Sequence, residues 1–135
     1  MKDFRQKTYH LDFKPLAWSR AGYNRVSGFY DTQARDKTCM RIYLENQHFG
    51  EELFHKPCRL DVVFYMPIPA NHYRKKVQPI HHVFTPDLDN LIKYLLDSIK
   101  GIIIADDRMV CSITAKKIYT SADSTRTEFT ITEVE

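Results

Sequence analysis

Residues 86–110 read PDLDNLIKYLLDSIKGIIIADDRMV and contain the clearest helical pattern in the chain. Its apolar residues recur at the spacing of one helical face. They are Leu88, Leu91, Ile92, Leu95, Leu96 and Ile99. Asp87 stands at the N-cap position and Gly101 follows the last apolar residue, and both are residue types that commonly begin and end helices. The pattern predicts an amphipathic helix over 88–99.

Strands are predicted on both sides of this helix. Residues 58–65, CRLDVVFY, are rich in β-branched and aromatic types, and this strand is expected to end before Met66-Pro67. After the helix, residues 109–119 and 126–134 are predicted to form two strands that pair with each other across a turn at 121–124.

The N-terminal half carries weaker signals. Residues 7–14 alternate enough for a strand, residues 15–30 contain turn formers and are predicted to be a loop, and residues 31–47 are predicted to be a helix. Residues 66–86 contain four prolines and three of the six histidines, which predicts a long exposed loop. The order strand, helix, strand, helix, strand, strand predicts one α+β domain over residues 1–135, with a small mixed sheet and two helices.

Composition narrows the class of protein. The longest aliphatic run, Ile102-Ile103-Ile104, is far too short to cross a bilayer, and the first ten residues contain no apolar stretch of a secretory signal. The cysteines, Cys39, Cys58 and Cys111, are scattered and odd in number. This pattern is typical of reduced, buried thiols and not of a disulfide framework or a zinc knuckle. The sequence predicts a cytoplasmic protein with no membrane partner and no small-molecule cofactor.

Basic side chains gather in two places, which points to nucleic acid as a partner. One group lies within residues 1–30 and another in the predicted loop after residue 66. The candidate DNA contacts are Arg20, Arg25, Tyr73, Arg74, Lys75 and Lys76. Aromatic residues interleaved with the first group can stack on unpaired bases or pack in the core. They are Trp18, Tyr23, Phe29 and Tyr30. An ordinary solubilising surface fits the same charge pattern.

A compact set of carboxylates is the candidate catalytic feature. Asp87 and Asp89 begin the predicted helix, and Asp106-Asp107 precede the next strand. If the N-terminal end of the helix and the start of that strand meet, three carboxylates converge near Lys93. Such a group needs a cation to stay ionised, and its hard oxygen ligands favour Mg²⁺, with Mn²⁺ as a possible substitute.

Each of these residues also has a structural alternative. Asp87 is a good N-cap, and Asp89 and Lys93 have the spacing of an ordinary i, i+4 surface pair. Asp106-Asp107 fit a turn before a strand. His81-His82 lack the spacing of a helical zinc pair and are expected in a solvated or phosphate-contacting loop.

The segment from Pro86 to Val110 resembles the signature of the RusA family of Holliday-junction resolvases. That signature has a D-x-D-N-x-x-K helix start, an L-L-D near the helix end and a D-D before a strand. The matching residues are Asp87, Asp89, Asn90, Leu91, Lys93, Leu96, Asp97, Asp106 and Asp107. The N-terminal half of the chain resembles the family only loosely.

The resemblance implies a homodimeric, magnesium-dependent endonuclease that nicks opposed strands of four-way DNA junctions in recombination and repair, of a kind often encoded by prophages. It implies that Asp87, Asp89 and Asp107 bind the metal, that Lys93 is the catalytic lysine and that Asp106 is a supporting carboxylate. The alternative function is a non-catalytic module that binds branched or single-stranded nucleic acid.

Overall fold

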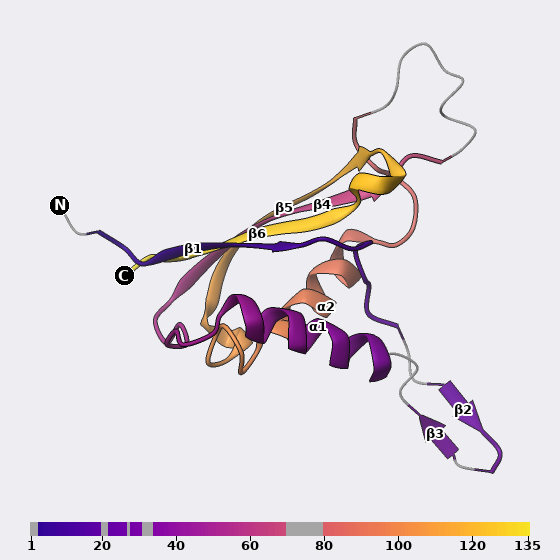
Figure 1. The fold of residues 1–135 in the computed structure, drawn as a ribbon, viewed down its shortest axis with the longest axis horizontal. Coiled ribbons are helices and arrows are strands. Elements are labelled where there is room, and N and C mark those ends of the chain that lie inside the picture. The colour runs from indigo at the N-terminus through magenta and orange to yellow at the C-terminus, as the bar shows by residue number, and fades with distance from the viewer. Residues whose placement is uncertain (1–2, 20–21, 27, 31–33, 70–79) are drawn as a thin grey trace.

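Four strands form a mixed sheet in the order β1-β6-β4-β5 (Figure 1). Their bounds are Gln6–Leu11 for β1, Cys58–Pro67 for β4, Val110–Thr120 for β5 and Arg126–Glu133 for β6. The computed structural model describes residues 3–19, 22–26, 28–30, 34–69 and 80–135. The predicted α+β class, the two helices and the order of the main elements are confirmed.

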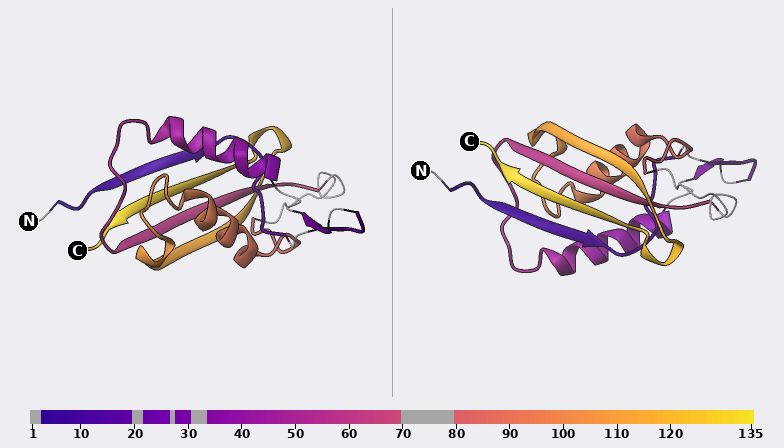
Figure 2. Two further views of the ribbon diagram at one scale, coloured as in Figure 1. Left: turned by 90° about the horizontal axis from the view of Figure 1, so that it is seen from below. Right: turned by 90° about the horizontal axis from the view of Figure 1, so that it is seen from above.

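Both helices cover the same face of the sheet, and the opposite face carries no helix of the described residues (Figure 2). Helix α2, Leu88–Ile99, has the bounds that its apolar spacing predicts, and it buries Leu91, Leu95 and Ile99. Helix α1, Ala34–Gln47, contributes Met40 and Leu44 to the core. Strand β4 buries alternate residues from Cys58 to Met66, as expected for a central strand with one covered face.

The predicted pairing of the last two strands is wrong. β5 pairs in parallel with β4, and β6 pairs antiparallel with β4 and β1, so β4 lies between the two strands. A short 3₁₀ helix, η3 at Ala122–Ser124, connects them where a hairpin turn was expected. The chain therefore crosses over β4 before β6 enters the sheet.

The two predicted loops contain more pairing than their composition indicates. Within 15–30, β2 at Gly22–Asn24 and β3 at Gly28–Tyr30 form a short antiparallel hairpin, and Gly28 adopts a positive φ of 79° there, a conformation that glycine adopts readily. Within 66–86, β4 continues through Pro67. After residues 70–79, which are outside the described part of the structure, the chain lies beside β5, where His81 forms a β-bridge with Ile118. His82 is consequently buried and not solvated.

The thiols also differ from the prediction. Only Cys58 is buried, whereas Cys39 and Cys111 are exposed because they lie on the outer face of α1 and near the start of the edge strand β5. No helix of the described residues is long and apolar enough to span a membrane.

Candidate active site

Asp87 occupies the N-cap position of α2 without acting as a cap. Its backbone is extended, and its carbonyl oxygen accepts hydrogen bonds from the N–H groups of Asn90 and Leu91, both at 3.2 Å. Its carboxylate makes no capping hydrogen bond and is exposed. The capping alternative is therefore not realised by the side chain, whose oxygens remain open to another ligand.

Asp89 lies in the first turn of α2 and is also exposed. The alternative that it forms a surface pair with Lys93 is not realised in the described part of the chain. The Lys93 ammonium lies instead over the ring of Trp18, with Nζ 3.8 Å from the ring centroid. Asp87 and Asp89 thus present two exposed carboxylates at the start of one helix, where the helix dipole favours negative charge.

The segment that precedes Asp87 is fastened to β5 by Lys117. Its ammonium donates hydrogen bonds to the carbonyl oxygens of Phe84, at 2.9 Å, and Pro86, at 2.8 Å. The backbone N–H of His82 donates to the carbonyl oxygen of Lys117 at 3.1 Å. Lys117 therefore fixes the position from which Asp87 projects. Nothing in its sequence context indicates this role, because its partners are carbonyl groups more than thirty residues away.

His82 packs under the same segment, against the ring of Tyr119 at a centroid distance of 5.1 Å. Burial lowers the pKa of His82, and the nearby charge of Lys117 lowers it further. Its Nδ1 has no hydrogen-bond partner in the described residues. The neutral imidazole is therefore the form that this packing favours.

Asp106 and Asp107 occupy the other end of α2 and differ in their roles. Asp106 caps the short 3₁₀ helix η2, Asp107–Met109, by accepting a hydrogen bond from the Arg108 N–H at 3.2 Å. That bond, a hydrogen bond with Asp107 and the charges of Lys100 and Arg108 hold the pKa of Asp106 below its usual value. Asp106 thus has a local structural function, whereas Asp107 is the first residue of η2 and does not serve as its cap.

The expected convergence of the carboxylates does not occur within one chain. β4 and β5 are parallel, so the helix between them runs back along the sheet, and its N-terminal end lies at the far end from the start of β5. The twelve residues of α2 separate the two groups by about 18 Å at a rise of about 1.5 Å per residue. Accordingly, no cluster of three potential metal-ligating side chains occurs among the described residues.

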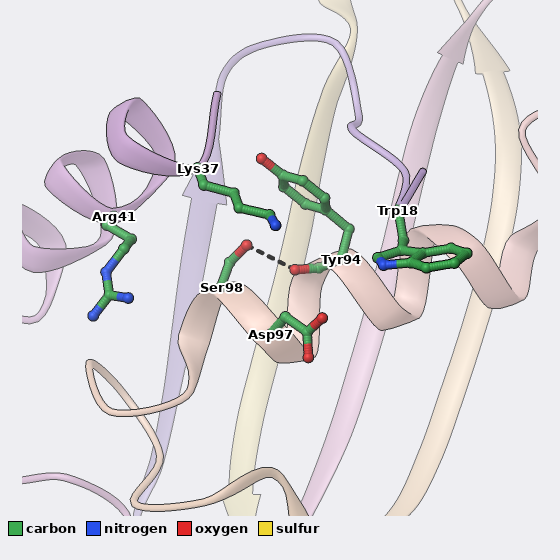
Figure 3. A pocket seen from close by; sticks show the side chains of 6 residues that line it. All are labelled: Trp18, Lys37, Arg41, Tyr94, Asp97 and Ser98. Carbon is green, nitrogen blue, oxygen red and sulfur yellow. Dashed lines mark hydrogen bonds between the residues drawn. The ribbon is translucent and has the colours of Figure 1, made fainter. Parts of the chain in front are cut away.

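A pocket lies between the two helices (Figure 3). Lys37 and Arg41 of α1 and Asp97 and Ser98 of α2 line it, with Lys37 pointing toward Ser98 and Trp18 at one end. Ser98 is buried, and its hydroxyl donates to the Tyr94 carbonyl oxygen at 2.7 Å. The lining of the pocket thus combines the cationic side chains of Lys37 and Arg41 with the carboxylate of Asp97.

The predicted DNA contacts are only partly visible. Arg25 is exposed in the turn between β2 and β3, on a hairpin that projects beyond the helices in Figure 1. The other predicted contacts lie outside the described residues: Arg20, Tyr73, Arg74, Lys75 and Lys76. The side chains of Tyr23, Phe29 and Tyr30 are likewise outside the described part of the structure.

Comparison of the sequence with known proteins identifies relatives of this chain. A family model described as Endodeoxyribonuclease RusA matches residues 12–132. The chain belongs to the RusA endodeoxyribonuclease family. A crossover junction endodeoxyribonuclease, rusA of Lactococcus phage r1t, is 30% identical over 132 residues, which cover 93% of this chain and 95% of the relative. The uncharacterized protein YqaN of Bacillus subtilis strain 168 is 30% identical over 96 residues, just under two thirds of either chain at 66%. The RusA match includes the N-terminal half, where the sequence motifs were weak.

Proposed function

We propose that this RusA-family chain is a divalent-metal-dependent endonuclease that resolves four-way DNA junctions by paired nicks in opposed strands. The observation that carries the proposal is the exposure of the Asp87 and Asp89 carboxylates and their lack of partners among the described residues. Both carboxylates are exposed at the start of α2, and neither caps the helix nor pairs with a described cation. The phage relative named as a crossover junction endodeoxyribonuclease supports branched DNA as the substrate.

The donor set fits a hard cation. Asp87, Asp89 and Asp107 would hold Mg²⁺, or Mn²⁺ in its place, because carboxylate oxygens are the ligands these ions prefer. When bound, the ion supplies a water of lowered pKa and neutralises charge on the phosphate. Asp106 supports the site by fixing η2. Lys93 holds the scissile phosphate and stabilises the negative charge that grows on it.

The separation of the carboxylates favours a site shared by two subunits. Asp87 and Asp89 lie at the start of α2, and Asp107 lies in η2 beyond the end of that helix, so one chain cannot bring all three to one ion without refolding. In a twofold dimer, Asp87 and Asp89 of one protomer would meet Asp107 of the partner subunit. The same symmetry generates a second identical site, which is what two opposed nicks require.

DNA binding is assigned to the basic side chains that flank the carboxylates in sequence. Arg25 is exposed on the β2–β3 hairpin, and we propose that Arg20, Tyr73, Arg74, Lys75 and Lys76, which lie outside the described residues, also contact DNA. In a dimer these residues occur twice, so a junction with several duplex arms engages more of them than a linear duplex does. The preference for junctions should shrink as salt rises.

Nicking of a synthetic four-way junction with and without Mg²⁺ tests the catalytic proposal. Asp89→Asn is expected to abolish nicking and to keep junction binding, because removing a negative charge does not weaken contact with phosphates. Asp123→Asn, which removes an exposed carboxylate from the first turn of η3, is the matched control and should nick normally. Near wild-type nicking by Asp89→Asn would remove the metal assignment. Binding without any nicking by the wild-type protein would leave a nucleic-acid-binding module.

Light scattering combined with competition binding tests assembly and substrate choice. A stable homodimer that prefers a junction over a linear duplex of the same sequence is expected. A monomer at micromolar concentration would contradict the shared site, and equal affinity for the two DNAs at moderate salt would contradict the junction preference.

A further inference from the structure

Lys93 forms no ion pair with either of the two described carboxylates that lie one helical turn from it in the sequence. Asp89 lies four residues before it and Asp97 four residues after it, and residues at this spacing are neighbours on a helix surface. All three side chains are exposed. The described structure nevertheless gives Lys93 no ion pair with either carboxylate, and its Nζ lies 3.8 Å from the centroid of the Trp18 ring.

Trp18 reaches this place from outside the helix. It belongs to the segment between β1 and β2, and its backbone N–H donates a hydrogen bond to the carbonyl oxygen of Asn90 at 3.0 Å. The side chain is half-buried and packs against the hydrophobic core. Figure 3 shows the indole lying along α2 beside Tyr94. The ring is therefore held at one edge of the Asp89–Lys93–Asp97 stripe by both a main-chain bond and packing.

The interaction energies favour contact of the Lys93 ammonium with the Trp18 ring over an ion pair with Asp89 or Asp97. Exposed i, i+4 ion pairs are weak because water screens them and the side chains lose freedom. A lysine over the face of tryptophan, the strongest of the aromatic partners, keeps its charge partly solvated and gains from the ring quadrupole as well as from packing of its methylenes. Trp18 thus competes effectively for the ammonium, and Asp89 and Asp97 remain unpaired with it.

We propose that Trp18 is a positioning residue for Lys93 that keeps its ammonium off Asp89. The contact holds the ammonium over the indole ring and leaves the Asp89 carboxylate open to a divalent cation. This inference rests on the proposed function, because it concerns the residues assigned there to metal and phosphate. Without the ring, Lys93 would pair with Asp89 and compete with the cation for it.

The contact itself can be tested without any activity. Trp18 is the one tryptophan among the 135 residues, so tryptophan emission reports on it alone. Lys93→Met should change the intensity or the emission maximum of the folded protein, whereas Lys116→Met, an exposed lysine of β5 on the face without helices, should not. Identical spectra for the wild type and both variants would overturn the contact and with it the proposal.

A double-mutant cycle separates positioning from packing. Trp18→Leu is expected to lower kcat for junction nicking by about 3- to 10-fold, the factor that corresponds to loss of a cation–π contact, with a smaller change in KM. Trp18→Phe, which keeps an aromatic face, should recover most of that loss. In the Lys93→Met background, Trp18→Leu should cost no further activity. Equal losses from Trp18→Leu in both backgrounds would assign the ring to packing alone and overturn the proposal.

Metal binding gives a readout that does not depend on nicking. Titration of the full-length protein with Mn²⁺, followed by electron paramagnetic resonance, should show weaker binding in Trp18→Leu and wild-type affinity in the Trp18→Leu/Lys93→Met double variant, because the double variant has no ammonium to pair with Asp89. If the wild type binds Mn²⁺ with this pattern but does not nick DNA, the proposed function fails and the positioning role stands. Unchanged affinity in Trp18→Leu, or no Mn²⁺ binding by the wild type, would overturn the positioning role.

Discussion

Replacement of Lys117 by methionine should disturb the proposed active site more than the fold. The ammonium donates to the carbonyl oxygens of Phe84 and Pro86 at 2.9 and 2.8 Å. Bonds from a charged donor contribute about 1.5–3 kcal/mol each when buried, and these partly exposed bonds should contribute about 1–3 kcal/mol together, since water replaces the lost donor. Methionine keeps the length of the side chain and removes only the donor.

The effect on activity should be larger than this loss of stability, because the segment 84–86 leads directly into Asp87. A shift of about 1 Å in a catalytic group can cost about 100-fold in rate. We therefore expect kcat to fall by roughly 10- to 100-fold, with junction binding largely kept. Urea denaturation measures the stability, hydrogen exchange of residues 82–87 measures the loosening, and single-turnover nicking measures the rate. Lys116→Met has the same charge change on the opposite face of the same strand and is the control. Indistinguishable rates and exchange in the two variants would refute the anchoring role of Lys117.

Three further predictions concern the proposed role of Lys93, acid stability and the core. Lys93→Ala should lower the nicking rate far more than junction affinity, because in the proposed mechanism its contact is made mainly with transition-state charge. Equal losses in single-turnover and binding assays would make it a plain phosphate contact. The folded pKa of His82 lies below its usual 6.5, so the unfolded state binds more protons and stability should fall as pH drops below about 6.5; thermal melts between pH 8 and pH 5 should show a smaller fall for His82→Gln, and an unchanged fall would exclude this group. Tyr9→Phe should destabilise the fold by about 1–3 kcal/mol in urea denaturation, because the buried His48 Nδ1 loses the hydroxyl that donates to it at 2.7 Å. A loss of stability below about 0.5 kcal/mol would show that this hydrogen bond contributes little.

Local patterns in the sequence predicted the local elements well. The spacing of Leu91, Leu95 and Ile99 is sufficient to place α2 within its bounds, because a helix is built from near neighbours in the chain. Pairing between distant strands leaves no such pattern, so the pairing of β6 with β4 and β1 was missed. Periodicity gives the two faces of a strand and does not identify its neighbours.

The positions of the carboxylates relative to one another could likewise not be predicted from local sequence patterns. Their residue types and spacing marked Asp87, Asp89 and Asp107 as a group, but their distance depends on the direction of α2 relative to β5. The parallel pairing of β4 and β5 sets that direction, and no motif within residues 86–110 encodes it. Trp18 and Lys117 were missed as positioning residues for a related reason, since each acts on α2 or its approach from a distant part of the chain.

Subunit mixing tests whether two protomers share one metal site. Asp89→Asn and Asp107→Asn are each expected to be inactive as purified homodimers. If Asp89 of one protomer and Asp107 of the partner subunit share a site, a mixed dimer has one doubly altered site and one intact site. Random exchange of equal amounts makes about half of the dimers mixed, so about a quarter of wild-type Mg²⁺-dependent nicking of a four-way junction should return. No recovery, with exchange verified by differently tagged subunits, would contradict the shared metal site.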